Sequence, residues 1–406
     1  METVAKAKTG ILSLSQKNEV LQKMATYIED CRTELIEINK TECANFDKND
    51  KALYDRLKVD DAKVAAMIEA VNEVATKADP IGKELYSFDH PNGMKVRNVT
   101  APFGTVLIIY ESRPDVTIEA AAIAFKSGNK ILLKGGKEAK SSNLKLVACW
   151  HNALKECGLS TDWIQYLDLQ RNETQAFLIN PDQPLDLIVP RGGEKLIEFV
   201  KTHAKCPVLV SGRGNNFLYV HQLADLEMAK NIILNAKLAK ISACNALDKV
   251  LVDERLPNKI KFIEELISAL RAKQSVEVFL EDGISTTNKV SIIKDEQVWF
   301  SEFLDYKIAI GIVSDENEAI NKINKYSGGH SASIITQNDN VANYFMTNVD
   351  AAAVYHNAST HFTDGGAFGM GAELAISTEK MHHRGPLGLE QLVSNKWYIK
   401  GNGQIR

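Results

Sequence analysis

One of the six cysteines stands in surroundings that suit a nucleophile. Cys244 lies in the segment KISACNALDK, directly after the small residues Ser242 and Ala243 and shortly before an expected strand at Lys249–Asp253. A thiol on a loop beside a helix start ionises more readily and can meet a substrate. A single cysteine is more often a small buried core residue, and no adjacent His or Asp offers the base of a cysteine protease. Both interpretations of Cys244 stay open at this point.

Paired glycines follow three of the expected strands. The pairs are Gly135-Gly136, Gly192-Gly193, and Gly212 with Gly214; Lys134 and Lys137 flank the first, and Arg191 and Lys195 the second. Glycines before a helix let a phosphate approach backbone N–H groups, although a tight turn is the commoner use of any one pair. The flanking cations favour phosphate modestly. The chain has neither GxGxxG nor GxxxxGK[ST], so a Rossmann fingerprint and a P-loop are not supported.

Other chemistries find little support. His382 and His383 are adjacent and point in different directions, and HExxH and paired CxxC motifs are absent, so we expect no metal site. A net charge of −4 gives no polycation for nucleic acid. The N-terminus lacks the apolar block of a signal peptide, and no apolar run is long enough to span a membrane. Cysteines without regular spacing read as free thiols, and we expect a cytoplasmic protein.

Short apolar runs alternate with helical patterns along most of the chain. Residues 1 to about 80 have the three-to-four spacing of helices. From there the expected strands are Lys95–Thr100, 104–110, Lys130–Lys134, Trp163–Leu167, Leu185–Pro190, Pro207–Ser211, Lys249–Asp253, Val276–Leu280, Lys307–Val313, Ser333–Thr336, Ala352–His356 and Lys396–Lys400. Buried strands that alternate with helices predict parallel α/β sheets. The last strand has little core of its own, and we expect it to pair with the hairpin near 95–100 or with another subunit.

Several blocks resemble the gamma-glutamyl phosphate reductase family, a branch of the aldehyde dehydrogenase superfamily. They include YESRP (110–114), PRGG (190–193), CNALD (244–248), SEFLD (301–305), GGHSASI (328–334) and the run from NAS (357–359) to RGPLGLE (384–390), in the family's order. The resemblance implies an aldehyde dehydrogenase-like fold with two parallel-sheet α/β domains and a small β oligomerisation arm. It implies a cofactor domain at 1–230 with the arm hairpin near 93–100, a catalytic domain at 231–365, and a return segment with the oligomerisation strand at 366–406.

The family's functional residues transfer to matching positions. Cys244 matches the catalytic nucleophile, and Asn245 with Ser112 is expected to assist the oxyanion. The cofactor contacts implied are Lys134, Gly135, Gly192, Gly193 and Glu302, the last on the nicotinamide ribose. The substrate contacts expected are Arg113, Lys137, Asn357 and Arg384, with Asn357 near the strand end that faces the cysteine.

The departures from ordinary aldehyde dehydrogenases are informative. Those enzymes have an asparagine where this chain has Ser112, and a glutamate that activates water where this chain has LVSGRGNN (209–216). An acyl phosphate reductase needs no such water, because phosphate carries the acyl group. The segment NNFLYVH (215–221) also departs from the family's own form, GxCHVYVD, and we interpret it as a strand.

The resemblance implies NADPH-dependent reduction of gamma-glutamyl 5-phosphate to glutamate-5-semialdehyde through a Cys244 thioester, the second step of proline biosynthesis from glutamate. It implies a homodimer or homotetramer and an association with glutamate 5-kinase as a separate protein. The alternatives are a semialdehyde dehydrogenase that acylates coenzyme A, against which YESRP and RGPLGLE argue, and a non-catalytic relative, against which Cys244, Glu302 and Asn357 argue.

Overall fold

The computed structural model describes residues 11–47 and 51–406, and in it the chain forms two compact units. Unit 1 contains the described residues up to Leu209 together with Gly371–Leu374 and Gly388–Arg406. Unit 2 contains Val210–Met370 and Ala375–Leu387. The boundaries predicted after residues 230 and 365 stay a prediction about functional domains.

A four-stranded parallel sheet in the order β5-β4-β3-β6 forms the centre of unit 1. Its strands are β3 (Thr105–Tyr110), β4 (Lys130–Lys134), β5 (Ile164–Tyr166) and β6 (Leu187–Arg191). Most of their residues are buried, as is typical of parallel strands that are covered on both faces. Leu107 and Ile109 pack in one cluster with residues of helices α7 (Arg171–Ile179) and α8 (Glu194–His203).

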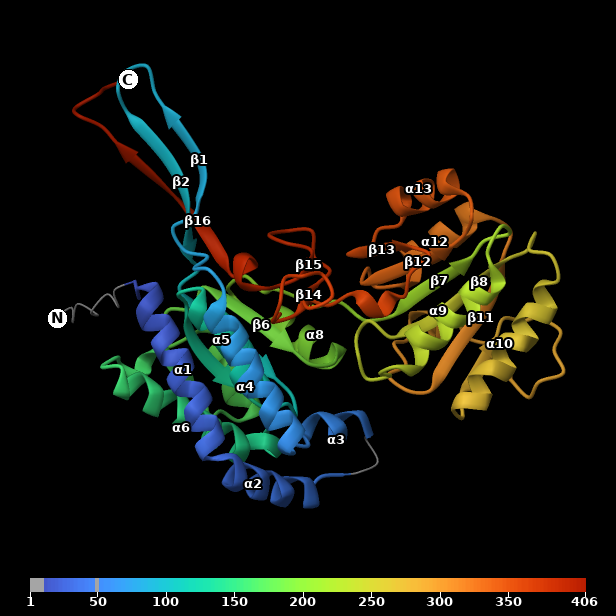
Figure 1. Ribbon diagram of the computed structural model, residues 1–406, viewed down its shortest axis with the longest axis horizontal. Coiled ribbons are helices and arrows are strands. Elements are labelled where there is room, and N and C mark those ends of the chain that lie inside the picture. Colours follow the sequence, from blue (N-terminus) through green and yellow to red (C-terminus); the bar gives the residue numbers. More distant parts are fainter. Residues whose placement is uncertain (1–10, 48–50) are drawn as a thin grey trace. The chain divides into compact units, whose positions relative to one another are not determined.

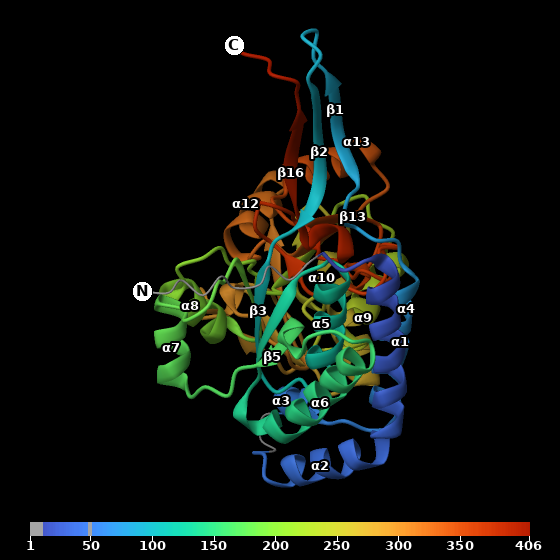
Figure 2. The same ribbon diagram turned by 90° about the vertical axis from the view of Figure 1, so that its left-hand side faces the viewer.

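Helices α5 (Val116–Lys126) and α6 (Lys140–Glu156) contact strands of this sheet (Figure 2). Helices α1 (Leu14–Asp30), α2 (Arg32–Ala44) and α4 (Asp61–Thr76) pack on these two, and α3 (Lys51–Leu57) contacts α2. The 3-10 turns η1 (Lys137–Ala139) and η2 (Thr161–Trp163) flank α6. Helix α1 begins at a capping box in which Ser13 and Gln16 satisfy each other's backbone N–H groups. The predicted helical character of the N-terminal region is confirmed for the described residues; residues 1–10 lie outside them.

Unit 2 is built on a seven-stranded parallel sheet in the order β10-β9-β11-β8-β7-β12-β13. The strands are β7 (Asn216–Val220), β8 (Leu247–Asp253), β9 (Glu277–Leu280), β10 (Ser291–Ile292), β11 (Lys307–Val313), β12 (Ser331–Ile335) and β13 (Ala353–His356). Leu218 and Val220 pack toward α9 (Leu226–Leu238) and α10 (Lys259–Lys273). Phe217 and Tyr219 pack on the other face, with residues of α11 (Gln297–Phe300), α12 (Glu316–Tyr326) and α13 (Asp339–Asn348). The strand period of two thus builds one core on each face.

Unit 1 also carries an antiparallel three-stranded arm, visible in Figure 1 as strands that extend beyond its helices. Strands β1 (Glu84–Asp89) and β2 (Lys95–Pro102) form a hairpin, and β16 (Val393–Lys400) pairs with β2 from Val393↔Pro102 to Lys400↔Lys95. The predicted pairing of the C-terminal strand with the hairpin is therefore confirmed. Tyr86 and Trp397 pack their rings 5.8 Å apart on an exposed surface of this arm.

The structure confirms the predicted fold class of two parallel α/β sheets with a small β arm. The predicted strand Pro207–Ser211 is wrong, since this segment makes only isolated bridges, Ile188↔Val208 and Ser211↔Ser377. Strand β1 was not predicted, because every residue in it is exposed. The short pairs β14 (Ile376–Ser377) with β15 (Gly385–Pro386), and the turns η3 (Thr360–Phe362) and η4 (Leu389–Gln391), complete the described elements. In the described ranges, each helix is too short or too polar to cross a membrane.

Candidate active site

Cys244 lies in the turn that connects α9 to β8, and its side chain is exposed. All six cysteines fall within the described residues, and Cys244 alone among them is exposed, whereas the other five are buried or half-buried. An accessible thiol on a turn suits a nucleophile better than a core residue. No helix begins at Cys244, since the chain passes directly into β8, so assistance from a helix start is not available.

The backbone of Cys244 is held by residues that lie just before β7 or at its start. The buried amide of Asn216 donates to the carbonyl oxygens of Cys244 at 2.8 Å and of Ala246 at 2.7 Å. Gly214 lies against the same turn, where an added Cβ would be 2.1 Å from the Cys244 carbonyl oxygen and 2.6 Å from its Cα. A side chain at position 214 would therefore displace the turn, which gives Gly214 a packing function instead of the suggested phosphate contact.

Asn245 fastens this turn to a distant segment. Its buried Nδ2 donates to the carbonyl oxygens of His361 at 2.9 Å and Thr363 at 3.2 Å, and its Oδ1 accepts from Nδ1 of His361 at 2.7 Å. The hydroxyl of Thr360 donates to the Asn245 carbonyl at 2.9 Å. Both amide hydrogens are thus committed, so we replace the expected oxyanion contact of Asn245 with a positioning role.

Asn357 does not face the cysteine, contrary to expectation. It follows β13 with φ 55°, and its amide accepts from the backbone N–H of Thr336 at 3.0 Å and donates to the Thr336 carbonyl at 2.9 Å. In a parallel sheet the residue after β13 lies at the carboxyl edge, whereas Cys244 precedes the amino end of β8. The chain reverses direction at Asn357 and then runs back beside β12, where the Ser333 hydroxyl donates to the Ala358 carbonyl. It thus brings Thr360 to Asn245. These contacts favour a structural role over a substrate contact.

Glu302 lies in the loop between α11 and β11 and is half-buried. The residues on either side of it bond to the side chains of Asp248 and Lys249, near the amino end of β8. Cys244 also precedes this end, so Glu302 and the thiol belong to the same edge of the sheet. Burial lowers the pKa of Lys249 to about 7, against the opposing effects of Asp248 and Glu302.

In unit 1, the residues that follow β3 and β4 meet one another. The buried hydroxyl of Ser112 donates to Oε1 of Glu138 at 2.5 Å, so this hydroxyl, like the Asn245 amide, is already engaged. Lys134 ends β4, its ammonium donates to the Gly135 carbonyl at 2.8 Å, and burial lowers its pKa. Gly135 has a packing reason of its own, since an added Cβ would lie 2.2 Å from the Asn143 amide. Lys137 is exposed beside this group and lines a polar pocket. The pocket residues are Glu42, Asn45, Phe46, Lys137, Glu138 and Ser141.

The glycine pair after β6 forms the start of helix α8. The backbone N–H of Gly193 donates to Oε2 of Glu111 at 2.8 Å, and an added Cβ on Gly192 would lie 2.6 Å from the same carboxylate. A helix start with a bound carboxylate has the geometry of an anion site. Here the protein's own Glu111 fills it, so a contact of Gly192 and Gly193 with a cofactor stays a prediction.

The two predicted arginines both pair with acids. In unit 1, Arg113 contacts Asp115 at 3.1 Å and keeps 30% of its side chain exposed. In unit 2, Arg384 contacts Asp350 at 2.6 Å, and Asp350 also accepts from Lys380 at 2.8 Å. Asp350 precedes β13 and so lies toward the amino edge, the edge of Cys244. The placement agrees with a substrate contact for Arg384, but this contact stays a prediction.

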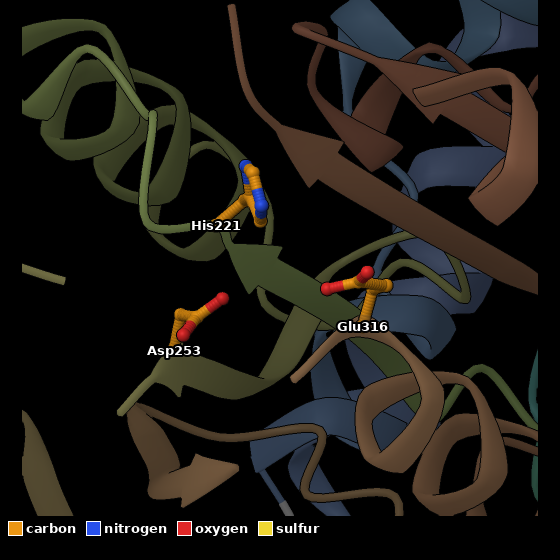
Figure 3. A group of neighbouring side chains, drawn as sticks. All are labelled: His221, Asp253 and Glu316. Atoms are coloured by element: carbon orange, nitrogen blue, oxygen red, sulfur yellow. The ribbon is translucent and has the colours of Figure 1, made fainter. Parts of the chain in front are cut away.

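His221, Asp253 and Glu316 form a group of potential metal ligands, with ligand atoms within 4.8 Å of one another (Figure 3). Arg255 donates to Asp253 at 2.8 Å and to Glu316 at 2.7 Å, and the Tyr219 hydroxyl donates to Asp253 at 2.5 Å. Burial would raise the pKa of Asp253, but these hydrogen bonds outweigh it and lower the pKa. The Arg255 guanidinium therefore already bridges both carboxylates, and the group is an ion-pair network at the carboxyl edge of the sheet.

The sequence reasoning missed Asn216, which holds the turn together with Gly214, and Glu111 and Glu138, which bond to predicted site residues. Glu111 stands inside the YESRP block and could have been considered with Ser112. Asn216 departs from the family pattern, and its only sequence signal was a polar residue at the start of a strand. The residues that these side chains contact lie far away in the sequence, and the hydrophobic periodicity of a sequence does not predict such contacts.

Residues 3–287 and 308–375 match the model of the aldehyde dehydrogenase family. The gamma-glutamyl phosphate reductase of Clostridium perfringens (strain 13 / type A) is 42% identical over 397 residues, 97% of this chain and 95% of that protein. That of Nautilia profundicola is 40% identical over 402 residues, 98% and 96% of the two chains. The crystal structure of the Thermotoga maritima gamma-glutamyl phosphate reductase has a TM-score of 0.90 at 38% identity, and the match covers 97% of this chain and 95% of that one.

The fold is also shared more widely. An acetylating aldehyde dehydrogenase from Geobacillus thermoglucosidasius matches 97% of this chain and 93% of that one with a TM-score of 0.69 at 17% identity. The chain therefore belongs to the aldehyde dehydrogenase family, in its gamma-glutamyl phosphate reductase branch, and is an oxidoreductase.

Proposed function

We propose that the protein reduces gamma-glutamyl 5-phosphate to glutamate-5-semialdehyde and phosphate with NADPH, the second step of proline biosynthesis from glutamate. The observation that carries this proposal is the exposed Cys244 thiol on a turn that Asn216, Asn245 and Gly214 hold in place. The near-full-length identity to gamma-glutamyl phosphate reductases supports the choice of substrate.

The thiolate of Cys244 attacks the gamma-acyl carbon, the carbon–oxygen bond to phosphate breaks, and phosphate leaves. A thioester remains on Cys244. NADPH, when bound, supplies the hydride that reduces this thioester. The resulting hemithioacetal alkoxide re-forms the carbonyl, its carbon–sulfur bond breaks, and the aldehyde and the thiolate are released. The departing phosphate takes up one proton from solvent, so the two steps together consume one hydride and one proton and return Cys244 to its starting state.

We assign the oxyanion to the main-chain N–H of Cys244, because this donor belongs to the residue whose sulfur attacks the carbon. The hydroxyl of Ser112 and the amide of Asn245, the other donors expected, are bonded to protein groups. One well-placed oxyanion donor lowers the barrier by about 3 kcal/mol. The turn contacts of Cys244 therefore serve catalysis because they fix the direction of this N–H.

The described residues of unit 1 fit a dinucleotide. The start of α8 offers an anion site, which Glu111 fills in this structure, and the end of β4 carries the cationic Lys134. The polar pocket lined by Glu42 and Glu138 suits hydroxyl groups, whereas Lys137 in the same lining stays the proposed contact for the anionic substrate. In unit 2, Glu302 supplies a carboxylate for ribose hydroxyls at the edge where Cys244 lies.

Phosphate dependence tests the proposal. The stretch 209–216 has no carboxylate that would activate water against a thioester, so phosphate or arsenate must accept the acyl group in the reverse direction. The assay follows NADP+ reduction with pyrroline-5-carboxylate, the cyclic form of the semialdehyde, with and without phosphate. We expect rapid turnover with phosphate or arsenate and very slow turnover without them. Turnover that needs coenzyme A instead, or fast production of glutamate without phosphate, contradicts the proposal.

A further inference from the structure

Three charged side chains are buried together beside the amino end of β8. Lys237 on α9 and Asp248 on β8 form an ion pair of 2.9 Å with almost no exposure, and the adjacent Lys249 is fully buried as well. Charges in an apolar interior are costly unless each has bonding partners, and apolar residues of similar size would often serve stability equally well. The hydrogen-bond partners of these three side chains therefore indicate their function.

Two of the three groups bond to the backbone on both sides of Glu302. The ammonium of Lys249 donates to the carbonyl of Ser301 at 2.8 Å. Oδ2 of Asp248 accepts from the N–H of Phe303 at 2.8 Å, while its Oδ1 accepts from Lys237. Successive residues of a strand point to opposite faces, so Asp248 and Lys249 reach the loop from the two faces of β8.

The loop begins where helix α11 ends. Residues 301–304 belong to neither helix nor strand, and Ser301 is tied to α11 by its N–H and its hydroxyl, which donate to the Gln297 carbonyl at 3.0 and 2.8 Å. The ring of Phe303 lies over the ammonium of Lys249, with 3.6 Å from Nζ to the ring centre, and stacks on Phe279 at 5.6 Å. The clamp adds one hydrogen bond on each side of Glu302, which the Lys249 side chain donates to Ser301 and the Asp248 carboxylate accepts from Phe303.

We propose that Lys249 and Asp248 are positioning residues that aim the Glu302 carboxylate at the ribose of the nicotinamide cofactor. The proposal rests on the proposed function, because it takes the cofactor contact of Glu302 from there. It extends that function by assigning cofactor affinity to two buried residues that touch neither cofactor nor substrate. Both stand within five residues of Cys244 on the same strand start, so one short segment, CNALDK, aligns thiol and carboxylate together.

The test measures the Kd of NADPH by fluorescence titration without substrate, for the wild type, Lys249→Met, Glu302→Gln and the double variant. If Lys249 acts through Glu302, each single change weakens NADPH by about tenfold, and the double variant is no weaker than Glu302→Gln alone. Independent contributions would multiply to about a hundredfold, and that result, or an unchanged Kd in Lys249→Met, overturns the proposal. An unchanged Kd in Glu302→Gln overturns it as well.

A matched control separates positioning from lost packing. Lys322 lies over the Trp299 ring at 4.0 Å in the same core, and its ammonium bonds to Glu281 instead of the 301–303 backbone. Lys322→Met should lower thermal stability without changing the Kd of NADPH. If Lys249→Met does not fold, Asp248→Ala removes the other half of the clamp and takes its place in the cycle. Failure of the wild type to bind NADPH or to turn over the semialdehyde would refute the proposed function itself, which distinguishes the two failures.

Discussion

Replacing Asn245 with Ala removes three hydrogen bonds between the Cys244 turn and the segment that contains η3. Two are donated by Nδ2 to the carbonyls of His361 and Thr363, and one is accepted from the His361 ring. At about 1 kcal/mol for each bond, the free energy of unfolding should fall by about 3 kcal/mol, and more if the two carbonyls stay dry. For a unit of this size that lowers Tm by about 6–12 °C.

Activity and stability together distinguish two roles for Asn245. An oxyanion donor would cost about 10²–10³ in kcat and leave the Tm unchanged. Loss of a positioning residue lowers both kcat and Tm, and we expect this result for Asn245→Ala. Calorimetry measures the Tm, and phosphate-dependent NADP+ reduction measures kcat. Thr360→Val is the matched control, because it removes the buried bond from the Thr360 hydroxyl to the Asn245 carbonyl. It should lower both quantities by a smaller amount, and a large loss of kcat in Asn245→Ala at an unchanged Tm would refute the reasoning.

Three further predictions follow from particular contacts. Gly214→Ala should lower kcat about a hundredfold, because the added methyl group displaces the Cys244 turn. The control is Gly311→Ala, whose methyl group meets Glu281 and Trp299 and should lower stability without changing kcat. Equal effects of the two substitutions on kcat would argue against the turn contact. The pKa of Lys249 is 10.5 in the unfolded chain and about 7 when folded, so the unfolded state binds more protons between pH 7 and 9. Stability should therefore rise over this range by about 2 kcal/mol relative to Lys249→Met in urea unfolding, and parallel pH profiles would contradict this. Deleting residues 394–406 bares the edge of β2 and should shift a dimer or tetramer toward monomer or aggregate in light scattering, a result excluded if the full-length chain is itself a monodisperse monomer.

The sequence predicted the two parallel sheets because buried strands carry their own signal. Runs such as 104–110 are apolar throughout, and only a strand covered on both faces needs that pattern. Strand β1 has no such run, since all its residues are exposed and its partner β2 alone makes it a strand. The predicted strand Pro207–Ser211 has the apolar composition but obtains only isolated bridges.

The sequence predicted the nucleophile of the site, but it did not predict the hydrogen bonds of the residues around it. Cys244 is recognisable from its motif, whereas the commitments of Asn245 and Ser112 depend on partners 116 and 26 residues away. Motif position alone therefore assigned them to the oxyanion. Asn357 likewise matches a family position, but the register of β12 and β13 places it at the carboxyl edge of the sheet, away from Cys244.

A single-turnover experiment without phosphate tests the central claim most directly. The enzyme is mixed with pyrroline-5-carboxylate and NADP+, quenched in acid within the first turnover, and digested for mass spectrometry, with Cys244→Ser as the control. The account predicts a burst of one NADPH per active chain, a glutamyl adduct on the peptide that contains Cys244, and neither in the variant. Continued turnover without phosphate, or a burst that persists in Cys244→Ser, would contradict a thioester on this cysteine.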